Sequence, residues 1–474
     1  MAVPELEVPL KVEHIAPIGS NSKLFTAVSI WQLHERGKLD VTQPFTRYAN
    51  TTALGLPRNW CPRLANANGT AVGACLAPPT IEQLLRMSGG IVDAGNCEYP
   101  PGSWQLKYCT QDQPACMPAY APDAFFSSIF GAADPTATVR NAGFLLAPFD
   151  FVPGTGHHYS NEAFQIASHI VEHVSGLPIS AYFKRNIFQP LGLNSTFLDV
   201  SGGLDGIYAN TVPYPSYVAY LNPVELGMYA FDKGYIGSAT YTAGTVNAAA
   251  LSPKARAAAG AGAPGRWAKT GRSALTSVPG SDFGYSSGSG AIQGSVGDMA
   301  RWLRALTVQP QRLGLKPETV RRMLNTSTRI PEPKGTTPFG SVGGAVAALK
   351  GRLRYAQGVV VVQDPSNRRL GVSGLFYKGS LGGFDATYYL ALHPTDPSKD
   401  TFVYVMTTTN TAFPAYSPYI VANGNRCSFK LNNASSSLPA YMCDAKKPLM
   451  GQGPAALLLD TYLKGFTGKG ALGL

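Results

Sequence analysis

The residues of this 474-residue chain with the clearest potential for chemistry are Ser20 and Lys23, in the run Ser20-Asn-Ser-Lys23. Residues at positions i and i+3 lie on one face of a helix, so this spacing brings the lysine amine over the serine hydroxyl. A serine hydroxyl is a weak nucleophile by itself, and a lysine that burial keeps neutral can act as its base. The pair therefore predicts nucleophilic catalysis by Ser20, and an ordinary serine capping a helix is the structural alternative.

Two helices are expected to carry this pair and to flank it. Apolar residues recur with a helical period over 21–36, and Gly37 stands where a helix C-cap belongs. A second helix is predicted over 162–175, because Ser160 lies near its start and Gly176 directly follows its end.

The other expected elements indicate an α+β protein with a helical lobe. Segments 48–121 and 229–272 are predicted to be mostly loop, and the first is a candidate wall of a binding cleft. The remaining helices are predicted over 80–87, 296–307 and 454–466, and strands over 358–363, 370–376, 384–392 and 401–408.

Several motifs resemble, in order, those of the serine β-lactamase-related family, which includes class C β-lactamases, penicillin-binding-protein-like hydrolases and esterases. The run from Ile18 to Ala27, followed by Gly37-Lys-Leu-Asp40, resembles the family's first motif, and Tyr159-Ser-Asn161 resembles its Tyr-x-Asn motif. The resemblance implies a β-lactamase/transpeptidase-like fold, with an antiparallel sheet flanked by helices and a mostly helical lobe. Further matches are Thr80-Ile-Glu-Gln-Leu-Leu85 with Ser88-Gly-Gly90, Phe188-Gln-Pro-Leu-Gly-Leu193 and Gly294-Ser-Val-Gly-Asp-Met299.

The same resemblance implies a role for each matching residue. Ser20 would be acylated, and Lys23 would assist its deprotonation. Tyr159 would carry protons to the leaving group and later from water, and Asn161 would hydrogen-bond Lys23 or a substrate carbonyl. The implied activity is hydrolysis of an ester, amide or β-lactam bond in a small-molecule or peptide-like substrate, without metal or cofactor. A catalytically inactive relative kept as a binding or scaffold protein is the alternative.

The third motif departs from the family pattern. Relatives carry Lys-x-Gly or His-x-Gly on a strand that lines the cleft, whereas this chain has Tyr377-Lys378-Gly379-Ser380, with Tyr377 where the Lys or His belongs. Alternation along a strand sends Lys378 to the opposite face unless a bulge restores it. Gly379 and the Ser380 N–H suit an oxyanion hole with the N–H of the nucleophile. The resemblance implies that all four residues contact substrate.

The whole chain, 1–474, is expected to form a single catalytic unit. The predicted division is 1–47 for the nucleophile helix, 48–290 for a helical lobe with a Cys-rich loop insertion, and 291–474 for the rest of the α/β lobe. Relatives have two strands before the nucleophile, but only 19 residues precede Ser20, and they contain no signal-peptide pattern. We therefore expect the front strands and an export signal to lie upstream of Met1.

Cysteines and glycosylation triplets predict a secreted or extracellular, eukaryotic-type glycoprotein. The seven cysteines lie in loop-like segments, and their clustering favours pairing Cys61 with Cys75 and Cys427 with Cys443. One of the middle three is then left over. These middle cysteines are Cys97, Cys109 and Cys116, and the Asn-x-Ser/Thr triplets begin at Asn50, Asn68, Asn194, Asn325 and Asn433.

Charge and motif spacing argue against several other functions. The formal net charge is +11, but the basic residues at 301–322 and 350–354 are interleaved with apolar ones, which predicts a solvated face rather than a nucleic-acid surface. No apolar run reaches the roughly 18 residues of a membrane span. The cysteines lack zinc-ligand spacing, so no metal site is predicted. The oligomeric state stays open.

Two further motifs are expected to be structural. Gly284-Tyr-Ser-Ser-Gly288 matches the Gly-x-Ser-x-Gly elbow but lacks the strand and helix that the elbow requires. His169-Ile-Val-Glu-His173 matches a zinc-binding pattern without an evident third ligand. Instead, the polar side of a surface helix is predicted to consist of Ser168, His169, Glu172 and His173. His157 and His158 are predicted to be solvated loop residues, with substrate contact as the alternative.

Overall fold

The computed structural model describes the longer ranges and the short strand segments that follow here. Described are residues 12, 14–93, 104–105, 147–198, 287–330, 352–381 and 384–407, and the strand segments 219–221, 241–242, 245–246, 276–278, 420–423, 426–431 and 434–438.

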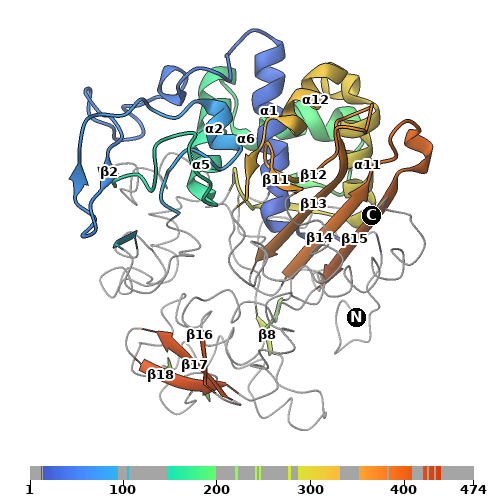
Figure 1. Ribbon diagram of the computed structural model, residues 1–474. Helices are drawn as coiled ribbons and strands as arrows, with labels where there is room; N and C mark the ends of the chain where they lie inside the picture. Colours follow the sequence, from blue (N-terminus) through green and yellow to red (C-terminus); the bar gives the residue numbers. More distant parts are fainter. Residues whose placement is uncertain are drawn as a thin grey trace.

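A six-stranded antiparallel sheet dominates the later part of the described chain (Figure 1). The strands lie side by side in chain order, and the four predicted strands are confirmed as β12 to β15. β13 runs on to Leu381, beyond the predicted end at 376, so the third motif lies within the strand. The strands are β10 Thr328–Arg329, β11 Leu353–Tyr355, β12 Val360–Gln363, β13 Val372–Leu381, β14 Phe384–Ala391 and β15 Thr401–Thr407.

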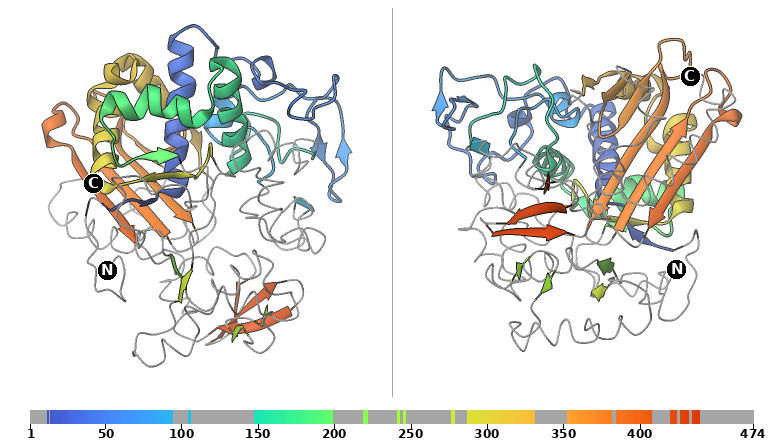
Figure 2. Two further views of the ribbon diagram at one scale, coloured as in Figure 1. Left: turned by 180° about the vertical axis from the view of Figure 1, so that it is seen from behind. Right: turned by 60° about the horizontal axis from the view of Figure 1, so that its bottom comes forward.

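Helices cover one face of this sheet, and α1 lies between the sheet and α5 (Figures 1 and 2). Four predicted helices are confirmed as α1, α2, α5 and α11. The basic helix α12 escaped prediction because only Thr319, Val320, Met323 and Leu324 of its nine residues are buried. The helices are α1 Ser22–Glu35, α2 Ile81–Leu85, α5 Asn161–Ser175, α6 Ile179–Phe183, α7 Gln189–Leu191, α11 Val296–Val308 and α12 Pro317–Asn325.

The termini of α5 follow the predicted signals. The Ser160 side chain accepts a hydrogen bond from the Ala163 N–H at the N-terminus, and Gly176 ends the helix in the left-handed region with φ 70°. The prediction of a polar outer side was wrong in part, because Ser168 is fully buried and His169 is only 6% exposed. A helix packed between other elements buries polar residues as well as apolar ones.

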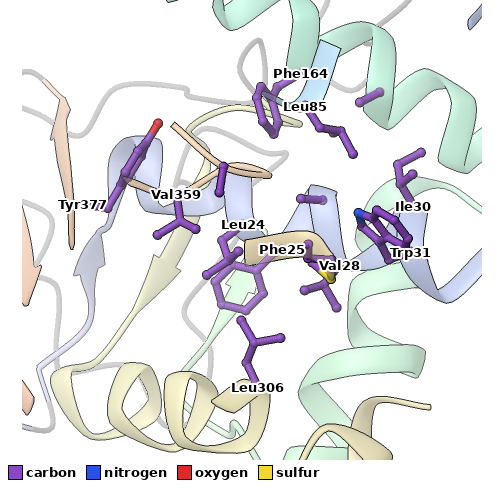
Figure 3. Close-up of a cluster of buried hydrophobic side chains, with 14 of the residues drawn as sticks. Leu24, Phe25, Val28, Ile30, Trp31, Leu85, Phe164, Leu306, Val359 and Tyr377 are labelled. Atoms are coloured by element: carbon purple, nitrogen blue, oxygen red, sulfur yellow. The ribbon is translucent and has the colours of Figure 1, made fainter. Parts of the chain in front are cut away.

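The core is built around α1, whose residues from Ser22 to Leu33 are all buried. Phe25 stacks on Trp302 of α11 with ring centroids 4.1 Å apart, and Figure 3 shows Phe25 near Leu24, Val28 and Leu306. A helix buried on every side is fixed in rotation as well as in position. The core therefore holds the start of α1 rigidly against the sheet.

A second, three-stranded sheet leads the chain into α1. Its order is β1-β9-β4, and the Ile18 N–H continues the pairing by donating to the Ile292 carbonyl at 3.0 Å. β1 is a short strand within the 19 residues that precede Ser20. The three strands are β1 Ala16–Pro17, β4 Phe197–Leu198 and β9 Ile292–Gly294.

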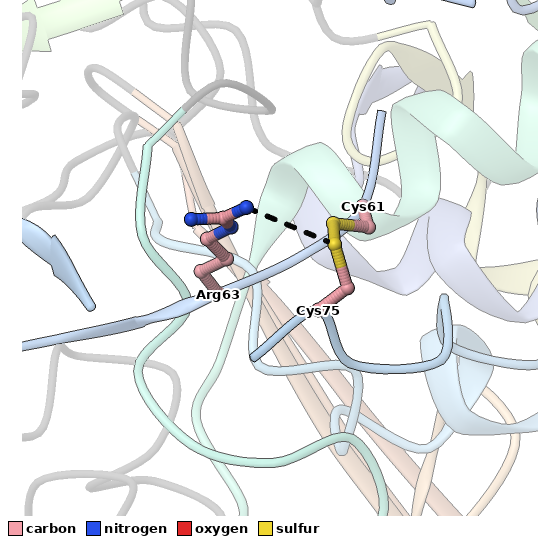
Figure 4. The surroundings of a disulfide bond; sticks show 3 residues. All are labelled: Cys61, Arg63 and Cys75. Carbon is pink, nitrogen blue, oxygen red and sulfur yellow. Dashed lines mark hydrogen bonds between the residues drawn. A yellow bond between two sulfur atoms is a disulfide. The ribbon is translucent and has the colours of Figure 1, made fainter. Parts of the chain in front are cut away.

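The predicted bridge between Cys61 and Cys75 is present, with the Arg63 guanidinium beside the Cys75 sulfur (Figure 4). It closes the loop that carries the β2–β3 hairpin. The remaining short strands are β2 Leu64–Ala65, β3 Ala71–Val72, β5 Ala219–Leu221, β6 Tyr241–Thr242, β7 Thr245–Val246, β8 Thr276–Val278, β16 Ile420–Asn423, β17 Arg426–Leu431 and β18 Ala434–Leu438.

Some expectations fall outside the described residues. These are the helix at 454–466 and the pairings of Cys97, Cys109, Cys116 and Cys443. The division at 47/48 and 290/291 stays a prediction. Among the described residues, no helix has the length and apolar character needed to cross a membrane.

Candidate active site

Ser20 lies in a tight turn immediately before α1 rather than at the cap of the helix. The turn is the 3₁₀ segment Gly19–Asn21, and α1 has no side-chain cap. The Asn21 amide donates to the Ile18 carbonyl at 2.8 Å and to the Ala386 carbonyl of β14 at 3.0 Å. Asn21 thus ties the turn to the sheet and leaves the partly exposed Ser20 hydroxyl available for chemistry.

Lys23 joins three elements at one point. Its Nζ lies 3.0 Å from Ser20 Oγ, 2.6 Å from Asn161 Oδ1 and 2.9 Å from the Ser289 carbonyl oxygen. The structure therefore brings together Ser20 and Lys23, as their spacing predicted, and places Asn161 at Lys23, which is one of the two roles that the resemblance implied. Ser289 was not foreseen.

Burial shapes the acid–base behaviour of Lys23. The side chain is fully buried, and this desolvation lowers the pKa of Lys23 to about 7, although the carboxylates of Asp93 and Glu162 oppose the shift. Near neutral pH a large fraction of the amine is therefore unprotonated. A neutral amine has a lone pair and can take a proton, which an ammonium cannot do.

An ammonium could make the three contacts of Lys23 with three N–H donors, and the neutral amine that the lowered pKa favours can make them as follows. Asn161 Oδ1 and the Ser289 carbonyl can only accept, so they occupy the two N–H donors of an –NH₂ group. The lone pair is then directed to the Ser20 hydroxyl as an acceptor. This geometry can deprotonate Ser20.

Tyr159 lies on the other side of Ser20. Its hydroxyl is 2.5 Å from Ser20 Oγ, and its ring lies against Lys23, with Nζ 4.8 Å from the ring centroid. The residues on both sides of Tyr159 bind Met87: the His158 N–H donates to the Met87 carbonyl at 3.1 Å and the Ser160 N–H to Met87 Sδ at 3.3 Å.

The Tyr159 hydroxyl is held in its neutral form. Burial, and then the neighbouring phenol of Tyr377, raises the pKa of Tyr159 well above its ordinary value of 10. At neutral pH the group is therefore a proton donor and carrier, and a phenolate base is not present. Lys23 is left as the base.

A row of phenols continues from Tyr159 into the sheet. Tyr377 of β13 hydrogen-bonds Tyr159, and its hydroxyl lies 2.5 Å from that of Tyr355 on β11. The ring of His157 follows, 5.7 Å from the Tyr355 ring between centroids. Burial, helped by the neighbouring His158, lowers the pKa of His157 to about 4, so its imidazole is neutral at neutral pH. His157 is thus a partly buried member of the site wall.

The third motif lies directly against the nucleophile turn. β13 pairs with β14 without a break from Gly374 to Leu381, so the bulge that would have turned Lys378 inward is not there. Tyr377 and Gly379 share the face toward Ser20, and Lys378 is on the opposite face. The structure therefore does not bring Lys378 to Ser20, because side chains alternate along an unbroken strand.

Gly379 allows the two backbones to touch. A Cβ on Gly379 would collide with the Ile18 carbonyl and lie 2.9 Å from the Ser20 nitrogen. The backbone of the next residue, Ser380, pairs with Asp385 of β14. β13 thus passes beside the Ser20 amide, where an oxyanion hole from these two segments can form.

The other candidate motifs have structural partners. His169 Nε2 accepts the Asn50 N–H at 3.1 Å, and Glu172 Oε1 accepts the Ile179 N–H at 2.8 Å. Across the described residues, no group of His, Cys, Asp and Glu side chains is arranged to hold a metal ion. Residues 284–286 of the Gly-x-Ser-x-Gly match lie outside the described residues.

Sequence reasoning missed Ser289, Met87 and Tyr355, and also the carboxylates Asp93 and Glu162. Ser289 and Met87 act through backbone or thioether atoms that no motif specifies. The only available signal for Ser289 was its place just after the Gly-x-Ser-x-Gly match. No signal in the sequence marked Tyr355, because tyrosine is common in strands.

Comparisons with known proteins give the family and the fold of this chain. A putative D-alanyl-D-alanine carboxypeptidase of Escherichia coli K12 is 39% identical over 49 residues, which is 10% of this chain and 11% of that protein. The chain thus matches about a tenth of the length of these curated relatives. The octameric penicillin-binding protein homologue from Pyrococcus abyssi has a TM-score of 0.51 at 18% identity, over 92% of this chain and 81% of that chain.

A D-amino acid amidase from Ochrobactrum anthropi has a TM-score of 0.50 at 14% identity, over 86% of this chain and 81% of that chain. These two structures share the fold, which confirms the predicted α+β, β-lactamase/transpeptidase-like class. The family model named Beta-lactamase matches residues 4–423. The chain belongs to the beta-lactamase family.

Proposed function

We propose that the protein is a serine hydrolase that cleaves an ester, amide or β-lactam bond through an acyl-enzyme on Ser20. The observation that carries the proposal is the contact between Ser20 Oγ and the buried Lys23 amine at 3.0 Å. Membership of the beta-lactamase family supports it. The substrate is a small molecule or a peptide-like compound.

Acylation begins with proton transfer from Ser20 Oγ to Lys23 Nζ. The Ser20 oxygen forms a bond to the substrate carbonyl carbon, and the carbonyl oxygen takes the negative charge beside the N–H groups of Ser20 and Ser380. Tyr159 gives its proton to the leaving group as the scissile bond breaks, and the proton held by Lys23 replaces it. The acyl group then remains on Ser20.

Deacylation repeats these steps with water. The water gives a proton to the Tyr159 oxygen as Tyr159 passes its own proton to the neutral Lys23 amine, and the water oxygen attacks the acyl carbon. The bond to Ser20 Oγ breaks, and the proton returns to that oxygen. Asn161 holds the Lys23 amine in place throughout, since its Oδ1 lies 2.6 Å from Nζ.

A fluorophosphonate probe tests the nucleophile. We expect one adduct per chain by intact mass, located on Ser20 by peptide mapping and lost in Ser20→Ala. Ser29→Ala is the matched control, because Ser29 lies on α1, the helix that follows Ser20, and its hydroxyl donates to the Phe25 carbonyl one turn before it. Hydrolysis that persists in Ser20→Ala would refute the assignment of the nucleophile.

The alternative is a catalytically inactive binding or scaffold protein. It predicts that Ser20 stays unlabelled in a folded preparation and that ester, amide and lactam substrates are left intact. The buried amine weighs against it, since keeping a lysine out of water without catalytic use only costs stability.

We also propose that the protein is exported and glycosylated. The Cys61–Cys75 bridge supports this, as do the exposed side chains of Asn50, Asn68 and Asn194 at acceptor triplets. The Asn325 amide differs, because it donates to the carbonyls of Arg321 and Leu370. Glycosidase treatment in heavy-oxygen water followed by peptide mapping should mark Asn50, Asn68 or Asn194 in protein secreted from a eukaryotic host, and an unmodified, intracellular product would contradict the proposal.

A further inference from the structure

The wall of the site next to Ser20 is made of phenols. Tyr377 occupies the strand position that faces the nucleophile turn, two residues before Gly379. Its hydroxyl is fixed between Tyr159 and Tyr355, and the latter contact is 2.5 Å long. Tyr377 is only 1% exposed and its hydroxyl already has two partners, so it offers a substrate at most one remaining lone pair and no positive charge.

Among the residues that the structure describes, the charged side chains that act on Lys23 are carboxylates. Asp93 and Glu162 are both buried, and both act on Lys23. The Asp93 carboxylate accepts the Asn161 N–H at 3.3 Å. Lys23 itself is held by Ser20, Asn161 and Ser289 and must be neutral to act as base, so it is not available to pair with a substrate anion.

We infer that Tyr355 and Tyr377 form a neutral hydrogen-bonding wall that selects esters and amides carrying no carboxylate next to the scissile bond. An anionic group placed there would lose its water and meet the field of Asp93 and Glu162 without a compensating cation from the wall. An uncharged polar group can instead bond to the Tyr377 hydroxyl. The inference rests on the proposed hydrolase function and narrows its substrate class.

Tyr355 is the specificity-determining residue that sequence motifs do not mark. Its hydroxyl is bonded to Tyr377, which in turn bonds Tyr159 beside Ser20. We assign it the role of fixing the direction of the Tyr377 hydroxyl. Its removal should affect the recognition of the leaving group more than the reactivity of Ser20.

A matched pair of substrates tests the wall directly. The 3-carbamoylphenyl and 3-carboxyphenyl esters of butyric acid have the same acyl group and similar size, and they differ by one charge at about pH 8. We expect kcat/KM to be roughly tenfold or more in favour of the carbamoyl ester, the size expected when one unit charge is unfavourably placed. Equal values, or a preference for the carboxylate, would overturn the inference.

Two substitutions locate the preference. Tyr377→Lys places a cation in the wall and should reduce or reverse the preference, while Tyr355→Phe should reduce kcat/KM for the carbamoyl ester several-fold with little change in labelling of Ser20 by a fluorophosphonate. Tyr389→Phe is the control, because Tyr389 pairs with Phe376 and thus lies on the opposite face of the sheet. A Tyr377→Lys protein that binds the fluorophosphonate yet keeps the original preference would count against the wall.

Binding to Ser20→Ala separates this inference from the proposed function. Calorimetry with both esters on this variant should rank the carbamoyl ester above the carboxyl ester, whether or not the wild-type protein hydrolyses either one. If Ser20 of the wild-type protein is not labelled, the hydrolase proposal alone is refuted. If Ser20→Ala binds the carboxyl ester more tightly than the carbamoyl ester, the inference about the wall alone is refuted.

Discussion

Gly379 of β13 and Ser20 of the nucleophile turn meet backbone to backbone, although 358 residues of chain separate them. A Cβ at Gly379 would lie 2.9 Å from the Ser20 nitrogen and would collide with the Ile18 carbonyl. The strand can therefore approach the nucleophile only as glycine. This contact sets the distance between the two segments that supply the proposed oxyanion hole.

Gly379→Ala should push the strand away from the turn. We expect Ser20 labelling to slow by at least tenfold and the free energy of unfolding to fall by about 1–3 kcal/mol, as for other overpacked positions. Gly297→Ala is the control, since its nearest neighbour would be Ser295 Oγ at 4.0 Å and alanine favours the helix. Equal labelling rates in both variants would show that the close contact is not needed.

The rate should depend on pH through Lys23. Because the pKa of Lys23 is lowered to about 7 and the neutral amine is the base, kcat/KM should rise with pH through about 7 and then level off. The measurement is a pH profile with an uncharged ester. Lys23→Met should lower kcat/KM by several orders of magnitude. If the residual activity of Lys23→Met still rises with pH through about 7, the rise does not come from the titration of Lys23.

Stability should also depend on pH through Lys23. Its folded pKa of about 7 lies below the ordinary value of 10.5, so the unfolded chain binds more protons between these pH values. The free energy of unfolding should therefore rise with pH across this window by up to about 1.4 kcal/mol per pH unit from this residue. Urea unfolding at several pH values should show this slope in the wild type but not in Lys23→Met; parallel curves would contradict it.

Met87 should position Tyr159. It has a positive φ of 57° and binds the N–H groups of His158 and Ser160, on the two sides of Tyr159. Met87→Leu keeps the apolar volume but removes the sulfur acceptor, so we expect kcat to fall about tenfold with KM nearly unchanged. Met299→Leu makes the same change in a buried part of α11 and should leave kcat and KM unchanged. A similar fall in kcat in both variants would point to general destabilisation.

The α1 core should dominate stability. Phe25 is fully buried and stacks on Trp302, so Phe25→Ala should lower the free energy of unfolding by about 3–5 kcal/mol in urea titrations. Val72 is 41% exposed, and Val72→Ala should change it by less than about 0.5 kcal/mol. A small effect at Phe25 would mean that the site tolerates a cavity beside α1.

The sequence alone determined the features that depend on local geometry. Ser20 and Lys23 meet because the helical backbone places residues three apart on one face, and this needs no tertiary information. The ends of α5 follow from Ser160 and Gly176 for the same reason, since caps act within one turn. The order of the motifs was enough to predict the family, and the resemblance implied that Asn161 bonds either Lys23 or a substrate carbonyl.

The tertiary structure decided what depends on register and burial. The unbroken pairing of β13 with β14 turned Tyr377, and not Lys378, toward Ser20, and only the folded sheet brought Tyr355 to Tyr377. The lowered pKa of Lys23 likewise comes from its complete removal from water by elements far away in the sequence. Local patterns cannot specify these relationships, because each is the result of long-range packing that no short segment contains.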